Sequence, residues 1–489
     1  MKNGINRYLS NFKNILILLL LSNLIFLFIY KIYLQSFVIE ITSSKKDIMD
    51  VEYYKVIFNN LEYAVIIVIV FIGIVLVGFE KIKNYFIKTL SNNNLLVFCI
   101  ITSITIQLLL ILFITPVPIS DSKHHINNAN LLYESGSYIN STGNLTAFWT
   151  VGLPAYLVFL KSFSSNFILT AKLLNILIST GLIIFCYFVF KNYLTPYALN
   201  LFLIILTFFP NNLLSSNIIL TDYPFAFFLW GSVLMMFKMH KKSSVALPVL
   251  IGLFFAFASY LRPAGIILPF IFGGILLLKK YTAGRINCFI MLTVFLLIML
   301  PWGIRNYNLF HSFVPVSTNG GYIFLMGNHK NSSGEVNFNF EYNILNPNEA
   351  DESRKAYSRA FNDILNNPFK SLVRFPRKIL YTYYRGDSSV TWGFKQVEEN
   401  IPGIITSLIF YVTNLLFYFI ILLNIYMIFS YRKRINFKKY SELCVLSIYM
   451  FLILIVFVGS ERYHIPLIPV HIFLVAKYFD SKLTQERSF

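Results

Sequence analysis

Long runs of apolar residues dominate the sequence. Many of them approach the roughly 20 residues that a helix needs to cross the hydrocarbon core of a bilayer. Charged residues make up only 13% of the 489 residues, whereas a soluble chain carries about 25%. The runs therefore predict a polytopic, all-α membrane protein.

The apolar runs number about twelve, and each predicts one membrane-spanning helix. Residues 1–34 have a basic start like that of a signal peptide, but the apolar stretch is too long and no small-residue cleavage site follows, so we expect a retained helix. The predicted spans are 14–34, 62–79, 94–114, 167–190, 197–209, 224–239, 245–261, 264–279, 286–301, 401–430, 441–459 and 464–478.

The short loops between these spans carry most of the Lys and Arg residues. With the N-terminus inside, the basic loops 80–93, 238–243, 279–285 and 431–439 all fall inside, as the positive-inside rule requires. Both termini are then predicted to be cytoplasmic. The net charge of +19 has the same origin, so it does not indicate binding to nucleic acid.

This orientation divides the chain into four parts. Residues 1–93 form an extra two-helix segment, and 94–301 form a transmembrane core with a first outer loop at 115–166. Residues 302–400 form a small α-rich extracytoplasmic domain, with a helical stretch that begins near Asn348, which is predicted to be its N-cap. Residues 401–489 return to the membrane and end in a cytoplasmic tail. We find no internal repeat of the kind that transporters show.

Two acids and three arginines map to the predicted outer ends of the spans, together with one histidine. Charges at the edge of an apolar span are costly unless they are paired or used. Snorkelling to the headgroups would explain one isolated arginine, but three arginines, each in a turn beside a proline, favour a shared anionic site. The residues are Asp121, Asp222, Arg262, Arg305, Arg462 and His464.

These residue types suit transfer of a sugar from a lipid-linked phosphate. Arginine binds phosphate oxygens through two nitrogens and keeps its charge. Asp121 has two interpretations: a helix cap for 122–134, or the general base that takes the proton of an attacking hydroxyl. One carboxylate with arginines suffices for an inverting transfer, and the carboxylate pair of hydrolases is not required.

Several neighbouring side chains are further candidates. His124 and His125 could bind a divalent ion with an acid, but adjacent helical residues point about 100° apart, so contacts to a polar acceptor are the other interpretation. A sugar pocket could also be lined by Glu134, Trp149 and Tyr156, for which interfacial packing is the alternative.

The pieces that carry these residues resemble the GT-C superfamily, in the branch of protein O-mannosyltransferases and lipid A aminoarabinose transferases. They span roughly residues 95–475 and read SDSKHHINNANLLYESGSY, TAFWTVGLPAYLVFL, LTDYPF, LRPAG, PWGIRNYNLFHSFVPVSTNGG and ERYHIPLIPV. The resemblance implies that Asp121 is the catalytic acidic residue and Asp222 a second acidic position. It also implies that the donor phosphate is bound by Arg262, Arg305 and Arg462.

The chain departs from that branch at two places. Protein mannosyltransferases carry an Asp-Glu pair where this chain has Asp121-Ser122, and their Pro-Pro-Gly is Thr150-Val151-Gly152 here. The resemblance implies a glycosyltransferase of the bacterial inner membrane. It would move a sugar from undecaprenyl phosphate to a lipid, glycan or protein acceptor at the outer face, among membrane lipids. The alternatives are a lipid-linked-sugar flippase or transporter, and an O-antigen polymerase or ligase.

Overall fold

The computed structural model describes residues 2–30, 48–239, 244–278, 284–337, 340–343, 346, 348–398, 401–431 and 439–483. Within these ranges the chain is helical, which confirms the all-α prediction. Over the same ranges, β-type backbone pairing is limited to three isolated bridges: Pro116–Val397, Ile139–Leu145 and Glu335–Gly459.

Each of the predicted apolar runs contains an α-helix over most of its described residues. The boundaries agree closely for 167–190, whereas the run at 62–79 belongs to a helix that begins earlier and the run at 286–301 to one that ends later. The helices are α1 (Lys2–Ile29), α3 (Ile48–Val77), α5 (Leu95–Phe113), α8 (Phe167–Phe190), α9 (Pro196–Phe208), α11 (Asp222–Met239), α12 (Ala246–Leu261), α13 (Leu268–Leu278), α14 (Gly284–Phe310), α19 (Gly403–Tyr431), α20 (Ser441–Val456) and α21 (Ile468–Leu483).

The number of twelve spans is not confirmed. Among the described residues, the helices that are long and apolar enough to cross a membrane are α3, α5, α8, α14 and α19. A sixth span arises if α9 and the short α10 (Pro210–Leu214) are counted together across a bend of 50°. Several other apolar helices are shorter than the roughly 20 residues of a straight crossing.

The hydrophilic segment 302–400 is helical, as predicted, but the stretch from Asn348 forms two helices. Asn348 is the N-cap, since its side chain accepts a hydrogen bond from the backbone N–H of Asp351 at 3.2 Å. α16 (Glu349–Asn366) then ends and α17 (Pro368–Tyr383) begins after a single residue. A proline disfavours helical backbone at the residue before it, and Pro368 therefore starts a new helix.

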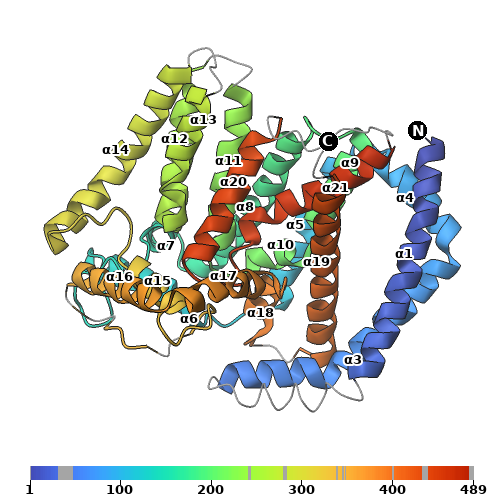
Figure 1. Ribbon diagram of the computed structural model, residues 1–489, viewed down its shortest axis with the longest axis horizontal. Coiled ribbons are helices and arrows are strands. Elements are labelled where there is room, and N and C mark those ends of the chain that lie inside the picture. Colours follow the sequence, from blue (N-terminus) through green and yellow to red (C-terminus); the bar gives the residue numbers. More distant parts are fainter. Residues whose placement is uncertain are drawn as a thin grey trace.

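Most of the long apolar helices run side by side, and a group of further helices gathers at one end (Figure 1). At that end lie α6 (Ser120–Ser135), α15 (Gly320–Asn328), α16, α17 and α18 (Ser388–Phe394). The start of α1, the basic α4 (Phe79–Leu90) and the end of α21 lie at the other end. Much of the three other basic loops, namely 240–243, 279–283 and 432–438, falls outside the described residues.

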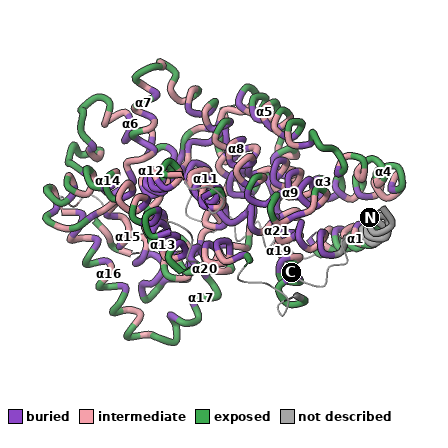
Figure 2. The backbone as a smooth tube through the Cα atoms, turned by 90° about the horizontal axis from the view of Figure 1, so that it is seen from above, coloured by how far each residue is buried: buried purple, intermediate pink, exposed green. Residues whose placement is uncertain are grey.

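The main core lies where α8, α9, α11, α12 and α21 meet, and buried residues occupy the middle of the bundle (Figure 2). The Trp230 indole donates a hydrogen bond to the Pro466 carbonyl at 3.0 Å, which fixes the turn before α21 to α11. Outer faces carry large exposed apolar side chains such as Leu112, Phe113 and Phe289. Such surfaces suit contact with lipid.

Candidate active site

Asp121 reaches the site through the first turn of α6. The linker from α5 to α6 is extended and held by residues before α19, since Val117 N–H donates to the Gln396 carbonyl at 2.9 Å. The N-cap position is Ile119, and no side chain caps the helix. The structure therefore contradicts the capping interpretation of Asp121. An acid in the first helical turn is favoured by the helix dipole.

Arg462 lies between the two acids. Its Nη1 donates to Oδ2 of Asp121 at 2.6 Å, and its Nη2 donates to Oδ2 of Asp222 at 3.1 Å. Arg462 comes from the turn between α20 and α21, and Asp222 is the first residue of α11. A planar guanidinium can bridge two carboxylates in this way because its donors point in fixed directions.

Arg262 binds the second acid as well. Its Nη2 donates to Oδ1 of Asp222 at 2.5 Å, and its Nε donates to the Thr221 hydroxyl at 3.2 Å. The Asp222 side chain is 2% exposed, and both arginine side chains are 14% exposed. Neither arginine snorkels to the surface. The structure thus brings together four of the five predicted charged residues.

The cluster contains two positive and two negative groups. Burial disfavours the ionised form of Asp121, but the Arg462 guanidinium outweighs burial, and the pKa of Asp121 lies below its usual value. Burial also opposes the charge of Arg462, yet Asp222 and Asp121 hold the pKa of Arg462 above its usual value. Asp121 and Arg462 are therefore both charged at neutral pH.

A small pocket opens beside this cluster. Its lining includes Asp222 and Arg462 together with Tyr223, Ser388, Ser389 and Trp392. The Arg462 guanidinium lies over the Trp392 ring, 5.1 Å from its centre. A cation over an indole face is attracted by the ring electrons, and Trp392 thereby helps to fix Arg462.

Trp149 connects the histidines of α6 to the first outer loop. The His124 ring stacks on Trp149 at 5.3 Å, and His125 meets the same indole edge-on at 5.8 Å. Burial lowers the pKa of His125 to about 4, so this imidazole is neutral at pH 7. Its Nδ1 has no hydrogen-bond partner among the described residues.

Arg305 is not part of the charged cluster. Its guanidinium donates to the carbonyls of Thr146 at 2.7 Å and Tyr138 at 3.1 Å, and lies over the Trp302 ring at 4.7 Å. Arg305 lies inside α14, five residues before its last residue Phe310, and not in the turn that the sequence predicted. It fastens the first outer loop to this helix. Its contacts to the loop are backbone carbonyls, which sequence patterns do not reveal.

The remaining predicted residues lie in three different surroundings. Glu134 is exposed in the last turn of α6, about 20 Å along the helix from Asp121 at 1.5 Å per residue. The Tyr156 side chain packs against the main core. His464 is fully buried, with its Nδ1 3.0 Å from the Thr382 carbonyl and its ring against Phe417.

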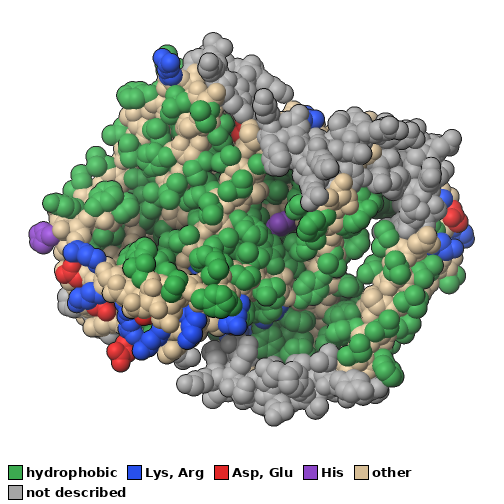
Figure 3. All heavy atoms as spheres, viewed as in Figure 1, with side chains coloured by type: hydrophobic (Ala, Val, Ile, Leu, Met, Phe, Trp, Pro, Cys, Tyr) green, Lys and Arg blue, Asp and Glu red, His purple; other side chains and the backbone are tan. Residues whose placement is uncertain are grey.

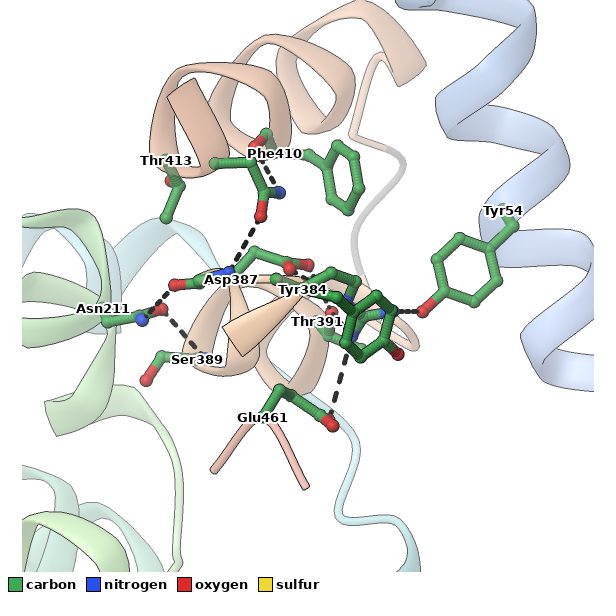
Figure 4. A network of polar contacts seen from close by, with 12 residues as sticks. Tyr54, Asn211, Tyr384, Asp387, Ser389, Thr391, Phe410, Thr413 and Glu461 are labelled. Atoms are coloured by element: carbon green, nitrogen blue, oxygen red, sulfur yellow. Dashed lines mark hydrogen bonds and ion pairs between the residues drawn. The ribbon is translucent and has the colours of Figure 1, made fainter. Parts of the chain in front are cut away.

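A second charged network lies beside the cluster, and the sequence patterns did not predict it (Figure 4). Arg385 pairs with Asp387 at 3.0 Å and approaches Glu461, the neighbour of Arg462, at 3.8 Å. The Thr391 hydroxyl donates to Asp387 at 2.8 Å. The sequence signal for this network was the Arg-Gly-Asp run at 385–387, between α17 and α18. Charged residues do not stand out there, because the hydrophilic segment of about 100 residues contains many of them.

The arrangement does not fit a bound metal ion. The carboxylates of Asp121 and Asp222 are the ligand type that hard divalent cations prefer. The guanidinium groups of Arg462 and Arg262 already contact both oxygens of Asp222 and Oδ2 of Asp121. Over the part of the chain that the structure describes, no group of three or more His, Cys, Asp and Glu side chains is placed to hold a metal.

Among known proteins, only solved structures show similarity to this chain. No protein-family model matches the sequence, and no curated protein matches it. The oligosaccharyltransferase AglB of Archaeoglobus fulgidus, in complex with an inhibitory peptide and a dolichol-phosphate, is similar over 78% of this chain and 49% of its own, with 14% identity and a TM-score of 0.45. A structure of the same archaeal protein with Zn and sulfate gives 14% identity over 80% of this chain and 50% of that one, with a TM-score of 0.45.

ArnT of Cupriavidus metallidurans, bound to undecaprenyl phosphate, is similar over 79% of this chain and 77% of its own, with 12% identity and a TM-score of 0.38. This chain spans about half the length of the archaeal protein. Because these TM-scores are below 0.5, a function for this chain has to follow from its own residues.

Proposed function

We propose that this protein is a membrane glycosyltransferase that moves a sugar from a polyprenyl-phosphate donor, undecaprenyl phosphate in bacteria, to an envelope acceptor. The observation that carries the proposal is the buried cluster of Asp121, Arg462, Asp222 and Arg262 at the polar end of an apolar bundle. A lipid-linked phosphate presents its headgroup at this depth, and arginine is the side chain best suited to receive it.

The donor phosphate binds at Arg462, whose guanidinium lies over the Trp392 ring. Arg462 is already balanced by two carboxylates, so an arriving phosphate competes with one of them. Asp222 is bound by two arginines and is 2% exposed, whereas Asp121 is bound by Arg462 alone and its side chain is 27% exposed. The phosphate therefore displaces Asp121.

Displacement changes the chemistry of Asp121. The Arg462 guanidinium holds the pKa of this carboxyl low, and a phosphate that takes over Arg462 lets that pKa rise toward its ordinary value. A freed carboxylate is a better proton acceptor. Donor binding would thus prepare the base for the acceptor hydroxyl.

The transfer step then follows simple bond changes. The acceptor oxygen forms a bond to the anomeric carbon, and the bond from that carbon to the phosphate oxygen breaks. The electron pair of the broken bond goes to the phosphate, where Arg462 and Arg262 stabilise the added charge. The hydroxyl proton goes to Asp121. Attack from the face opposite the phosphate inverts the anomeric carbon.

The first outer loop and the 302–400 segment cover the acceptor side in this proposal. Glu349 of α16 accepts hydrogen bonds from the backbone N–H of Ala147 at 2.9 Å and from the hydroxyl groups of Thr146 and Thr318. Trp149 lies two residues after Ala147 and contacts both histidines of α6. The hydrogen bonds of Glu349 thus fix the position of Trp149, whose indole lines one side of the site near Asp121.

The test is transfer of radiolabelled sugar from undecaprenyl phosphate by the full chain in membranes that contain the native acceptor. We expect wild type to transfer the label and Asp121→Asn to lose about 100-fold or more, the usual contribution of a general base. The matched control is Glu80→Gln, an exposed carboxylate at the other end of the bundle, which should keep full activity.

Other outcomes point to other functions. Full activity of Asp121→Asn in a protein with unchanged thermal unfolding would refute the base role. Movement of intact labelled donor across vesicles without transfer would identify a flippase, and chain growth on a lipid-linked glycan would identify a polymerase.

A further inference from the structure

Helix α17 is amphipathic in the reverse sense of a helix on a water-soluble protein. Its buried residues are all polar or charged: Ser371, Arg374, Lys378 and Thr382. Its exposed residues include large apolar side chains, with Phe369 at 77%, Leu372 at 60% and Leu380 at 64% exposure. In water the opposite arrangement is favoured, because exposed apolar area costs about 25 cal/mol per Å².

The polar face of α17 is held firmly against its own protein. Arg374 donates to the carbonyls of Asn328 at 2.9 Å, Lys330 at 3.1 Å and Ser332 at 3.2 Å. Lys378 donates to the Asn328 side chain at 2.8 Å and to the last carbonyls of α20, Ile455 at 2.9 Å and Val456 at 3.2 Å. The helix cannot rotate without breaking these bonds.

The apolar face is consequently fixed outward and continues the apolar surface of the bundle. Figure 3 shows hydrophobic side chains over α17 that continue the hydrophobic surface of the long helices. Lys and Arg lie along the lower edge, with Asp and Glu among them toward α16. The end of α16 adds Phe361 at 54% and Leu365 at 73% exposure. α17 itself lies across the ends of the long helices (Figure 1).

Two exposed cations border this face. Lys370 and Arg377 are seven residues apart, and at about 100° per residue they lie on the same flank, between the apolar and the buried polar sides. Long cationic side chains in this position reach lipid phosphates while the apolar residues enter the acyl region. A charge pattern of this kind fits an anionic bilayer surface.

We propose that α17 is an in-plane interfacial helix, with Phe369, Leu372 and Leu380 in the outer acyl region and Lys370 and Arg377 on the phosphates of anionic lipids. The outer segment then rests on the bilayer. Through Lys378 the docked helix also holds the end of α20, six residues before Arg462. This inference does not depend on the sugar-transfer proposal.

The direct test places an environment-sensitive nitrobenzoxadiazole label at Leu372→Cys in the full chain, with its four native cysteines replaced and the protein reconstituted in phosphatidylcholine and phosphatidylglycerol vesicles. We expect nitroxide lipids to quench the label and aqueous iodide not to. The matched control is Asn362→Cys on the polar face of α16, where iodide should quench and nitroxide lipids should not. Quenching of Leu372→Cys by iodide, or by neither agent, would overturn the proposal, since it would place the face in water or against a protein.

A second test keeps the native cysteines. Phosphatidylglycerol should raise the thermal unfolding temperature of the wild-type chain over that in phosphatidylcholine alone, and the double variant Lys370→Glu/Arg377→Glu should lose most of that increment. The double variant Arg354→Glu/Lys355→Glu, on exposed positions of α16, should retain it. Equal loss in both variants would show a general charge effect and would refute a site at α17.

Discussion

At the scale of single residues, the site is governed by one guanidinium that contacts two carboxylates. Arg462 uses Nη1 for Asp121 and Nη2 for Asp222, and Trp392 covers its face. Removing charge from a buried network of this kind leaves the partner charges uncompensated. The shape of the cation therefore matters as much as its charge.

Arg462→Lys should keep the positive charge and still lose about 100-fold of activity. An ammonium has no planar fork, so it cannot hold both carboxylates and receive a phosphate in the same geometry. The measurement is the same sugar-transfer assay, with thermal unfolding to confirm the fold. Arg359→Lys on the exposed face of α16 is the control. A fully active Arg462→Lys protein would show that Arg462 contributes charge alone.

The position of Arg462 also leads to a prediction about metal ions. The guanidinium stands where a cation would otherwise bridge Asp121 and Asp222, and a divalent ion would have to displace it. Transfer should therefore continue unchanged after treatment with EDTA. Activity that is lost in EDTA and restored by added Mg²⁺ or Mn²⁺ would show that the carboxylates exchange arginine for metal during the reaction.

At the scale of elements, the first outer loop is clamped between α14 and α16. Arg305 binds two loop carbonyls, and Glu349 receives a loop N–H and a loop hydroxyl. Glu349 is 3% exposed, and burial raises its pKa. The Glu349 carboxyl accepts hydrogen bonds from three groups, and a substitution that removes it leaves those three donors without an acceptor.

Glu349→Ala should destabilise the outer end by about 1–3 kcal/mol, the cost of leaving a buried polar group without its partner. Hydrogen exchange over residues 138–150 should accelerate, and the thermal unfolding temperature should fall. Glu352→Ala is the control, because Glu352 lies three residues later in α16 and is partly exposed. It should change neither the hydrogen exchange nor the unfolding temperature. Unaltered exchange in Glu349→Ala would mean that Arg305 alone holds the loop.

At the scale of the whole molecule, the bundle has two unlike ends. α6, which carries Asp121, lies at one end with α15, α16, α17 and α18, and the start of α1, α4 and the end of α21 lie at the other (Figure 1). The positive-inside rule predicts that the second end is cytoplasmic. The site would then face outward, where undecaprenyl-linked donors meet envelope acceptors.

A cysteine-free chain with Asn362→Cys should react with a membrane-impermeant maleimide in intact cells. Asn93→Cys, just after α4, should react only after permeabilisation. Both positions are exposed, so reactivity reports sidedness and not burial. The reverse pattern would place Asp121 in the cytoplasm, where soluble nucleotide sugars would replace the lipid-linked donor.

The sequence alone indicated the helical elements and the charged residues that the structure brings together. Helix formation in an apolar run depends on neighbours in the chain, so the twelve runs could be identified from their lengths. The charged residues at helix ends could be recognised for the same local reason, and the structure brought Asp121, Asp222, Arg262 and Arg462 together.

Only the tertiary structure decided which charge meets which. Asp121 and Arg462 are 341 positions apart in the chain, and no local pattern specifies that contact. Arg305 looked equivalent to Arg462 in sequence, but packing directs it to loop carbonyls. The face that α17 buries is likewise set by carbonyls of α15 and α20. Contacts of this kind form between groups that are distant in the sequence. They depend on how the helices pack, which a local sequence pattern does not reveal.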